Sequence, residues 1–194
     1  MSNVSKMKGS IFALAMICFA SMARAQLVQV GNPSYFSTYN LQTQCPQQVQ
    51  WELRSSDIGR AERSSNWHFQ SDIMHPLAVA THEDFTRSGY DRGHMCPAKD
   101  RSHSVYDMMN TFMMSNVAPQ APHVNRSSWL RTENTCRQDA LRYGSVSVLA
   151  LPVFLHRDTT WIGTHHVAVP HAFVKVEWLT TTDSVLNTWF IWNK

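Results

Sequence analysis

The chain has 194 residues, 43% of them hydrophobic, which suffices for one domain with a buried core and is short for two. Its 17 basic and 14 acidic residues give a formal charge of +3, and three of the basic residues lie among the first 25 positions. The remaining chain is formally neutral. This balance excludes a uniformly basic surface for polyanions, so any attraction for phosphate must be local.

The first 25 residues have the pattern of a cleaved secretory signal. Lys6 and Lys8 precede an apolar run from Ile11 to Met22, and Ala23-Arg24-Ala25 ends the segment. The run is shorter than the about 20 residues that a membrane-spanning helix needs. We therefore expect an exported protein, periplasmic or secreted, with a single mature domain over residues 26–194 and no membrane partner.

The first half of the mature chain predicts short strands between loops. Residues 26–50 are polar, with two prolines and scattered aromatics, and predict an irregular leader. Residues 51–54 alternate between apolar and polar and predict a strand, whereas the charged, serine-rich residues 55–66 predict a loop. Residues 90–95 and 111–116 contain apolar side chains between turn formers, and each segment predicts a strand.

The second half predicts a helix followed by strands. Residues 125–143 lack proline and glycine and carry apolar residues at helical spacing, so we expect a helix that ends before Gly144. Residues 146–154, 166–179 and 185–192 are rich in β-branched and aromatic side chains and predict strands. This order predicts an α+β domain with a mixed or antiparallel central sheet flanked by helices.

Three cysteines remain after the predicted cleavage: Cys45, Cys96 and Cys136. An oxidising compartment permits one bridge and leaves one thiol over. The sequence does not decide the pair, and we favour Cys45 with Cys136. None of the spacings resembles a zinc site.

Two segments carry polar side chains suited to acid–base and metal chemistry. In Asp91-Arg92-Gly93-His94, the histidine follows a glycine that lets backbone or substrate come close. On the predicted helix, Asn125, Trp129 and Glu133 follow one another at intervals of four and lie near one face. A base and an oxygen ligand for a divalent cation are the minimum for metal-assisted phosphodiester hydrolysis, and Glu133 can in addition hold a metal-bound water.

Each of these residues has an ordinary structural alternative. An isolated histidine is more often structural than catalytic. An asparagine near a helix start is more often an N-cap, and a tryptophan on a helical face is usually core. Spacing alone therefore does not establish the site.

Several separated motifs resemble the DNA/RNA non-specific endonuclease family. They are Asp91-Arg92-Gly93-His94, Ser115-Asn116, Pro119-Gln120, Asn125, Trp129 and Glu133. Downstream, Ile162 to Pro170 and Phe173 to Val176 resemble the endonuclease G branch in particular. The likeness covers roughly residues 50–193, nearly the whole mature chain.

The resemblance implies a ββα-metal (His-Me finger) fold in which His94 activates a water molecule. Asn125 would bind Mg²⁺ directly, or Mn²⁺ in its place, and Glu133 would act through the water shell of the metal. The implied substrates are DNA and RNA, cut without sequence specificity to leave 5′-phosphates. A homodimer stays open.

The resemblance also implies roles for two arginines. Arg92 would lie close to the site, and an upstream arginine would contact the scissile phosphate. Arg63 is the better match for the second role, with Arg60 as a rival. Arginine suits this role because its fork holds a phosphate by two hydrogen bonds.

Two other functions stay open at this point. A catalytically inactive relative would bind nucleic acid without cutting it. A histidine-rich metal-binding protein would use His75, His82, His165 and His166, although no pair four residues apart on a clear helix supports it.

The predicted metal ligand coincides with an N-glycosylation sequon, Asn125-Arg126-Ser127. A glycan on Asn125 would block the site. This favours a host that does not modify the sequon, such as a bacterium that exports the protein.

Overall fold

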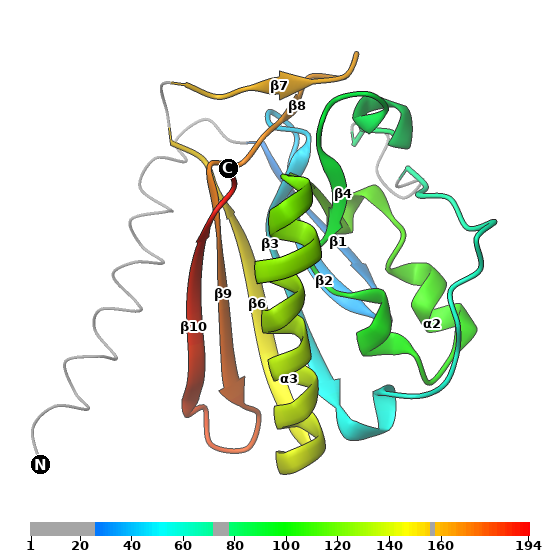
Figure 1. Ribbon diagram of the computed structural model, residues 1–194, viewed down its shortest axis with the longest axis vertical. Helices are drawn as coiled ribbons and strands as arrows, with labels where there is room; N and C mark the ends of the chain where they lie inside the picture. The colour runs from blue at the N-terminus through cyan, green and yellow to red at the C-terminus, as the bar shows by residue number, and fades with distance from the viewer. Residues whose placement is uncertain (1–25, 72–77, 156–157) are drawn as a thin grey trace, which may run out of the picture.

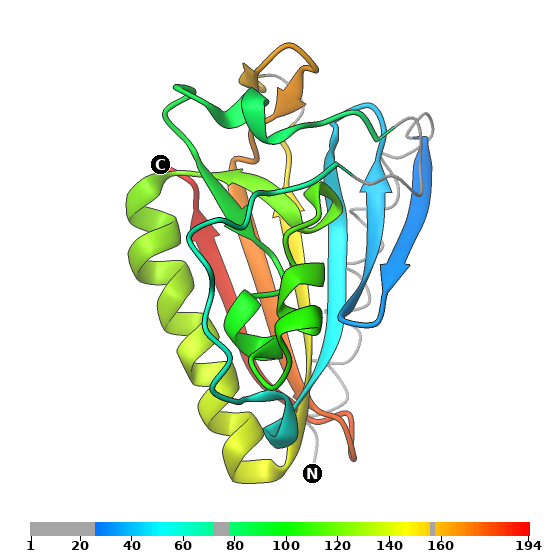
Figure 2. The ribbon, with the colours of Figure 1, turned by 90° about the vertical axis from the view of Figure 1, so that its right-hand side faces the viewer.

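The computed structural model describes residues 26–71, 78–155 and 158–194, so the signal predicted for residues 1–25 lies outside the described residues. An antiparallel sheet in the order β1-β2-β3-β6-β9-β10 forms its centre. The strands are β1 (Leu27–Asn32), β2 (Tyr35–Asn40), β3 (Cys45–Arg54), β6 (Ser145–Val153), β9 (Ala172–Leu179) and β10 (Val185–Trp192). Helices α2 (Val105–Asn110) and α3 (Leu130–Tyr143) lie on one side of this sheet (Figures 1 and 2). The predicted α+β class is confirmed.

The irregular leader predicted for residues 26–50 is wrong, because this segment forms β1, β2 and the first half of β3. Polar inward-facing side chains conceal the alternation of these strands. Ser37 Oγ donates to the carbonyl oxygen of Ser115 at 2.8 Å, and the buried hydroxyl of Tyr35 lies 2.9 Å from Ser115 Oγ. These hydrogen bonds offset the cost of burying polar groups. The strand predicted at residues 51–54 is confirmed as the end of β3.

Helix α3 packs against the middle of the sheet, on β3, β6 and β9 (Figure 1). It continues from a π-helical turn, η5 (Val124–Trp129), and ends at Gly144. Gly144 has a φ of 88°, in the left-handed region that favours glycine. The helix predicted over residues 125–143 is therefore confirmed, and the buried Trp129 and Cys136 on it join the main core.

A second, smaller unit precedes this helix. Strand β4 (Asp91–His94) pairs antiparallel with β5 (Val117–Gln120), and the chain then enters η5 and α3. The result is two strands followed by a helix. Gly93 allows the close approach of β5, because a Cβ atom at this position would lie 2.1 Å from Oε1 of Gln120.

The strand predicted at residues 111–116 is wrong. Residue 111 follows the end of α2, and Met114–Asn116 form the 3-10 helix η4, so the strand begins only at Val117. The side chain of Asn116 explains the difference. Its Oδ1 accepts from the backbone nitrogen of Cys96 and its Nδ2 donates to the carbonyl oxygen of Cys96, both at 2.8 Å. The Asn116 side chain thus binds the backbone N–H and C=O of Cys96, the groups that a neighbouring strand would otherwise bind.

The C-terminal strands follow the prediction with one break. The single strand predicted over residues 166–179 is two, β8 (Val167–Ala168) and β9, separated around Pro170, which lacks an N–H for a ladder hydrogen bond. Strand β8 pairs with β7 (Trp161–Ile162). The strands predicted over 146–154 and 185–192 are confirmed as β6 and β10.

The predicted bridge between Cys45 and Cys136 is wrong, because Cys45, Cys96 and Cys136 are all free. All three are buried in the main core. Burial raises the pKa of each thiol above its usual value. The three side chains therefore pack as small apolar groups that resist ionisation.

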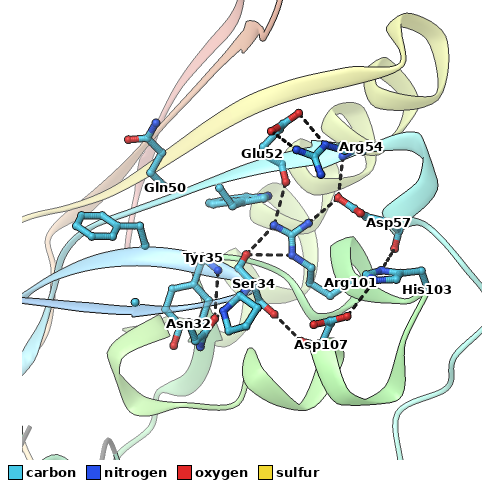
Figure 3. Close-up of a pocket in the computed structure, with 14 residues that line it drawn as sticks. Asn32, Ser34, Tyr35, Gln50, Glu52, Arg54, Asp57, Arg101, His103 and Asp107 are labelled. Carbon is cyan, nitrogen blue, oxygen red and sulfur yellow. Dashed lines mark hydrogen bonds and ion pairs between the residues drawn. The ribbon is translucent and has the colours of Figure 1, made fainter. Parts of the chain in front are cut away.

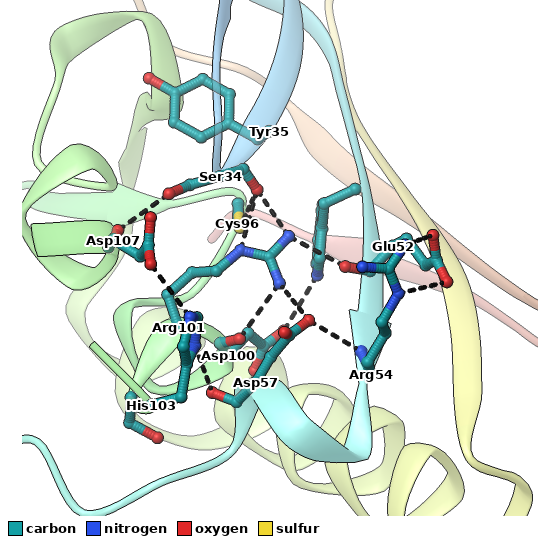
Figure 4. Close-up of polar contacts among 12 residues, drawn as sticks. Ser34, Tyr35, Glu52, Arg54, Asp57, Cys96, Asp100, Arg101, His103 and Asp107 are labelled. Atoms are coloured by element: carbon teal, nitrogen blue, oxygen red, sulfur yellow. Dashed lines mark hydrogen bonds and ion pairs between the residues drawn. The ribbon is translucent and has the colours of Figure 1, made fainter.

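A pocket of about 640 Å³ lies between the β1–β2 turn, β3 and α2, and none of the predicted site residues lines it (Figure 3). Arg101, at the end of the 3-10 helix η3 (Ala98–Arg101), holds this region together (Figure 4). Its guanidinium donates to the carbonyl oxygens of Ser34 and Glu52 and forms an ion pair with Asp57 at 2.9 Å. The guanidinium N–H groups of Arg101 bind these structural partners, so Arg101 connects the β1–β2 turn to η3.

Candidate active site

His94 is the last residue of β4, and its ring packs between two aromatic side chains. The ring centroids of Phe69 and Phe112 lie 4.9 Å and 4.8 Å from that of the imidazole. The imidazole is half-buried, and its Nε2 is buried without a hydrogen-bond partner in the described part of the chain. A buried polar atom without a partner is uncommon in folded proteins, and a water molecule or a substrate group would satisfy Nε2.

The surroundings of His94 keep its imidazole neutral. Burial, with a smaller contribution from the positive charge of Arg63, lowers the pKa of His94 to about 3. At neutral pH the ring therefore has a nitrogen lone pair available to accept a proton, as a general base requires.

Arg63, the arginine expected at the scissile phosphate, lies beside the same aromatic pair. Its Cζ atom is 4.6 Å from the ring centroid of Phe112 and 6.0 Å from that of Phe69. Burial lowers the pKa of Arg63, which nevertheless stays charged at neutral pH. Its rival Arg60 makes no such ring contact among the described residues.

The start of η5 is fastened to β4 through Asp91. Asn125 Nδ2 donates to Asp91 Oδ2 at 3.0 Å, and Arg126 donates to both carboxylate oxygens at 2.8 Å and 2.7 Å. Burial alone would raise the pKa of Asp91, but the hydrogen bonds from Arg126 and Asn125 hold it below its usual value. Trp129 Nε1 adds a further bond to the carbonyl oxygen of His94 at 3.1 Å.

Asn125 and Glu133 suit a hard divalent cation. Asn125 uses its amide nitrogen to bind Asp91, which leaves the oxygen Oδ1 outside that bond. The Glu133 side chain is only 13% exposed, and Arg137 Nη2 lies 3.9 Å from its Oε2. Burial raises the pKa of Glu133 to about 7, opposed by the charge of Lys175. A nearby cation would favour the ionised form, and Mg²⁺ prefers such oxygen ligands.

Arg92 belongs to the motif but directs its guanidinium elsewhere. It donates to the carbonyl oxygen of His82 and to Thr86 Oγ1, the latter at 3.0 Å. Its Cζ atom lies 5.7 Å from the ring centroid of Phe85. Arg92 therefore fixes the 3-10 helix η2 (His82–Phe85) against β4.

The structure adds residues to which the sequence assigned no role. Asp91 holds Asn125 in place, and Phe112 packs on the imidazole. Lys175 Nζ is buried 3.8 Å from the ring centroid of Trp129, without a hydrogen-bond partner in the described part of the chain. A charged residue at an inward position of an apolar strand is the one sequence signal that marks Lys175 as unusual.

The histidine-rich alternative finds no support in the described residues. His82 pairs with Glu83 at 2.8 Å and His165 with Asp84 at 2.9 Å. Across residues 26–71, 78–155 and 158–194, no three His, Cys, Asp or Glu side chains cluster as a metal site would require. His75 lies outside these ranges.

No described helix is both long and apolar enough to cross a bilayer.

A strand pair followed by a helix that braces a neutral histidine defines a ββα-metal type of domain. Within this class the chain belongs to the DNA/RNA non-specific endonuclease family, whose sequence profile matches residues 23–193.

Individual relatives agree with this assignment. The chain is 37% identical over 153 residues to the mitochondrial endonuclease G of Bos taurus, covering 74% of this chain and 51% of that protein. It is 36% identical over 104 residues to a nuclease of Nostoc sp., covering 54% of this chain and 38% of that protein. A crystal structure of an EndoG/EndoGI complex matches with a TM-score of 0.78 at 27% identity, covering 86% of this chain and 74% of that one. The chain spans about half the length of the curated relatives it matches.

Proposed function

We propose that this chain is a metal-dependent endonuclease that hydrolyses phosphodiester bonds of DNA and RNA without sequence specificity. The observation that carries the proposal is the neutral His94 imidazole, whose strand is fastened to the helix start that bears Asn125. In this mechanism His94 takes a proton from the attacking water, and the products carry 5′-phosphates. Family membership supports the proposal.

Asn125 would hold Mg²⁺ directly, and Glu133 would hold it through water. When bound, the ion neutralises charge that builds on the phosphate oxygens. Arg63, whose Cζ atom lies 4.6 Å from the ring centroid of Phe112, would hold the scissile phosphate by its guanidinium fork. Arg92 acts as a positioning residue through its bonds to His82 of η2 and to Thr86.

Recognition should rest on phosphates and shape. The sequence contains no helix-turn-helix or zinc-finger pattern that would read base edges. Binding through phosphates releases counterions, so cleavage should weaken as salt rises.

We also propose that residues 1–25 direct export and are removed, which leaves one domain over residues 26–194 in the periplasm or the medium. The pattern of two lysines, an apolar run and Ala-Arg-Ala supports this. Amino-terminal sequencing of the secreted protein tests the cleavage site.

A digestion assay tests the activity. Purified protein is incubated with plasmid DNA and with RNA, in Mg²⁺ and in EDTA. We expect both substrates to be degraded with Mg²⁺, protected by EDTA and degraded again when Mg²⁺ is restored. Binding of nucleic acid without any cleavage would instead identify an inactive relative.

A further inference from the structure

A second pocket, of about 390 Å³, lies between the segment that follows η2 and strand β7. This size falls within the range of small-molecule sites. Figure 1 shows β7 and β8 beside the loop that leads into β4. The lining residues are Glu83, Asp84, Thr86, Arg87, Ser88, Trp161, Ile162, Gly163 and Thr164.

The pocket combines a free aromatic surface with a free cation. Trp161 is 47% exposed, although tryptophan is usually buried. Arg87 is exposed and makes no ion pair or hydrogen bond within the described residues. The carboxylate of Glu83 at the pocket is paired with His82 at 2.8 Å. An indole face suits a nucleobase, and a guanidinium suits a phosphate.

The buried side chain of Asp84 links the two walls of this pocket. Its carboxylate accepts from the backbone nitrogens of Thr81 and His165 and lies 2.9 Å from His165 Nδ1. Gly163 packs so closely that a Cβ atom there would lie 2.2 Å from Asp84 Oδ1. The β7–β8 turn is therefore docked on η2, and the pocket is preformed.

Two contacts connect the pocket to the candidate active site. Thr86 lines the pocket and accepts a hydrogen bond from Arg92, two residues before His94 on β4. Phe69, which packs on the His94 ring, also packs on the small core that contains Ile162 of β7. The pocket and β4, which ends at His94, therefore share the contacts of Arg92 and of Phe69.

We propose that this pocket is a subsite for one nucleotide of an unpaired substrate strand, with its base stacked on Trp161 and its phosphate held by Arg87. The proposal rests on the proposed function, because it takes the nucleic acid as the substrate of His94. Stacking needs an exposed base face, so the subsite favours single-stranded DNA or RNA over a duplex.

The test measures binding separately from cleavage. Fluorescence anisotropy in EDTA gives the Kd for a single-stranded 20-nucleotide DNA and for its duplex. Trp161→Ala should weaken single-strand binding about tenfold and duplex binding little, whereas Trp161→Phe should retain it. Arg87→Ala should lower the slope of log Kd against log salt by about 1.

The matched control variants each remove an exposed tryptophan or arginine that lies outside the pocket. Trp192→Ala removes a tryptophan that is 50% exposed on β10, and Arg142→Ala removes an exposed arginine near the end of α3. Both should leave Kd and the salt slope unchanged. Melting temperatures check that every variant is folded.

Two failures are distinguishable. If the wild type binds the strand with the expected variant effects but never cuts in Mg²⁺, the subsite stands and the proposed activity fails. If Trp161→Ala binds the single strand as tightly as the wild type, or loses duplex binding equally, the subsite is overturned whatever the cleavage result.

Discussion

Trp129 donates its indole N–H to the carbonyl oxygen of His94 at 3.1 Å, so a fully buried side chain of the helix fixes the backbone of the proposed general base. The indole also contacts the ring of Phe173, at a centroid distance of 5.4 Å, and the buried ammonium of Lys175, at 3.8 Å from the ring centroid. Helix, sheet and β4 thus meet at one ring. We therefore infer that the position of His94 depends on the packing of Trp129.

Trp129→Phe tests this dependence, because it keeps an aromatic ring and removes the donor. We expect kcat to fall about tenfold, and stability to fall by about 1–3 kcal/mol because the His94 carbonyl loses its partner. Trp51→Phe is the matched control, since Trp51 Nε1 donates to the buried Asp100 at 3.0 Å. That variant should lose similar stability in urea unfolding with little change in kcat. Equal losses of kcat in both variants would contradict a positioning role for Trp129.

His94→Ala should lower kcat at least a hundredfold, within the range of about 10²–10⁴ for a general base. Exposed His103, paired with Asp107 at 3.0 Å, offers the control variant His103→Ala, which should retain activity. Undiminished cleavage by His94→Ala would remove His94 from the proposed role.

The low pKa of His94 also predicts a dependence of stability on pH. The folded-state pKa is about 3 against an ordinary value of 6.5, so between these values the unfolded state binds more protons. The contribution of His94 to the free energy of unfolding should therefore fall as pH drops from 6.5 toward 3. Urea unfolding at pH 7 and pH 4.5 should show a larger loss for the wild type than for His94→Ala.

Mg²⁺ affinity should increase with pH through Glu133. Its pKa of about 7 means that half of the carboxyl groups are protonated near neutrality, and the metal must displace that proton. From pH 8 to pH 6 the Kd for Mg²⁺ should rise about tenfold. Isothermal titration calorimetry at the two pH values measures this, and Glu133→Gln should bind weakly with no comparable pH dependence. A wild-type Kd independent of pH would exclude this proton coupling.

Gly93→Ala should disturb the strand pair, because the added Cβ would lie 2.1 Å from Oε1 and 2.4 Å from Cδ of the fully buried Gln120. Overpacking of this kind costs about 1–3 kcal/mol. The double variant Gly93→Ala/Gln120→Ala should recover part of that loss in thermal melts. In the control Gly31→Ala, the added Cβ would meet Phe36 at an ordinary 3.5 Å. A Gly93→Ala protein as stable as the control would contradict this prediction and show that the Gln120 side chain moves aside without a cost in stability.

The sequon gives a test of the Asn125 role without changing Asn125. Secreted from a glycosylating host, the protein should carry a glycan on Asn125 and be inactive, because the sugar blocks the amide. Ser127→Ala removes the sequon at an exposed position and should restore cleavage in the same host. Mass spectrometry confirms the glycan. Full activity of the glycosylated protein would exclude Asn125 as a metal ligand.

The elements with strong periodicity were predictable from sequence, and those shaped by tertiary contacts were not. The helix over residues 125–143 and the strands β6 and β10 carry their own pattern. Strands β1 and β2 escaped prediction because their inward serine and tyrosine groups find partners only in the fold, such as Ser115. Helix α2 was not predicted, because it has only six residues. Its N-cap is Ser104, whose Oγ accepts from the backbone nitrogen of Asp107 at 3.3 Å.

The candidate site shows the same division. His94, Asn125 and Glu133 stand out through motif and spacing, whereas the direction of Arg92 depends on η2, which has no clear pattern. Asp91 and Lys175 act through residues far away in sequence, Asn125 and Trp129 respectively. Such long-range pairings are set by topology, and one sequence does not reveal them.

The three free thiols in the core have a consequence for how the protein is made. With Cys45, Cys96 and Cys136 packed as apolar groups, the described fold forms no covalent cross-link and needs no oxidase or isomerase to mature. The polypeptide can reach the same native state in a reducing cytosol or an oxidising envelope. We therefore expect folded protein from cells that lack oxidative folding machinery.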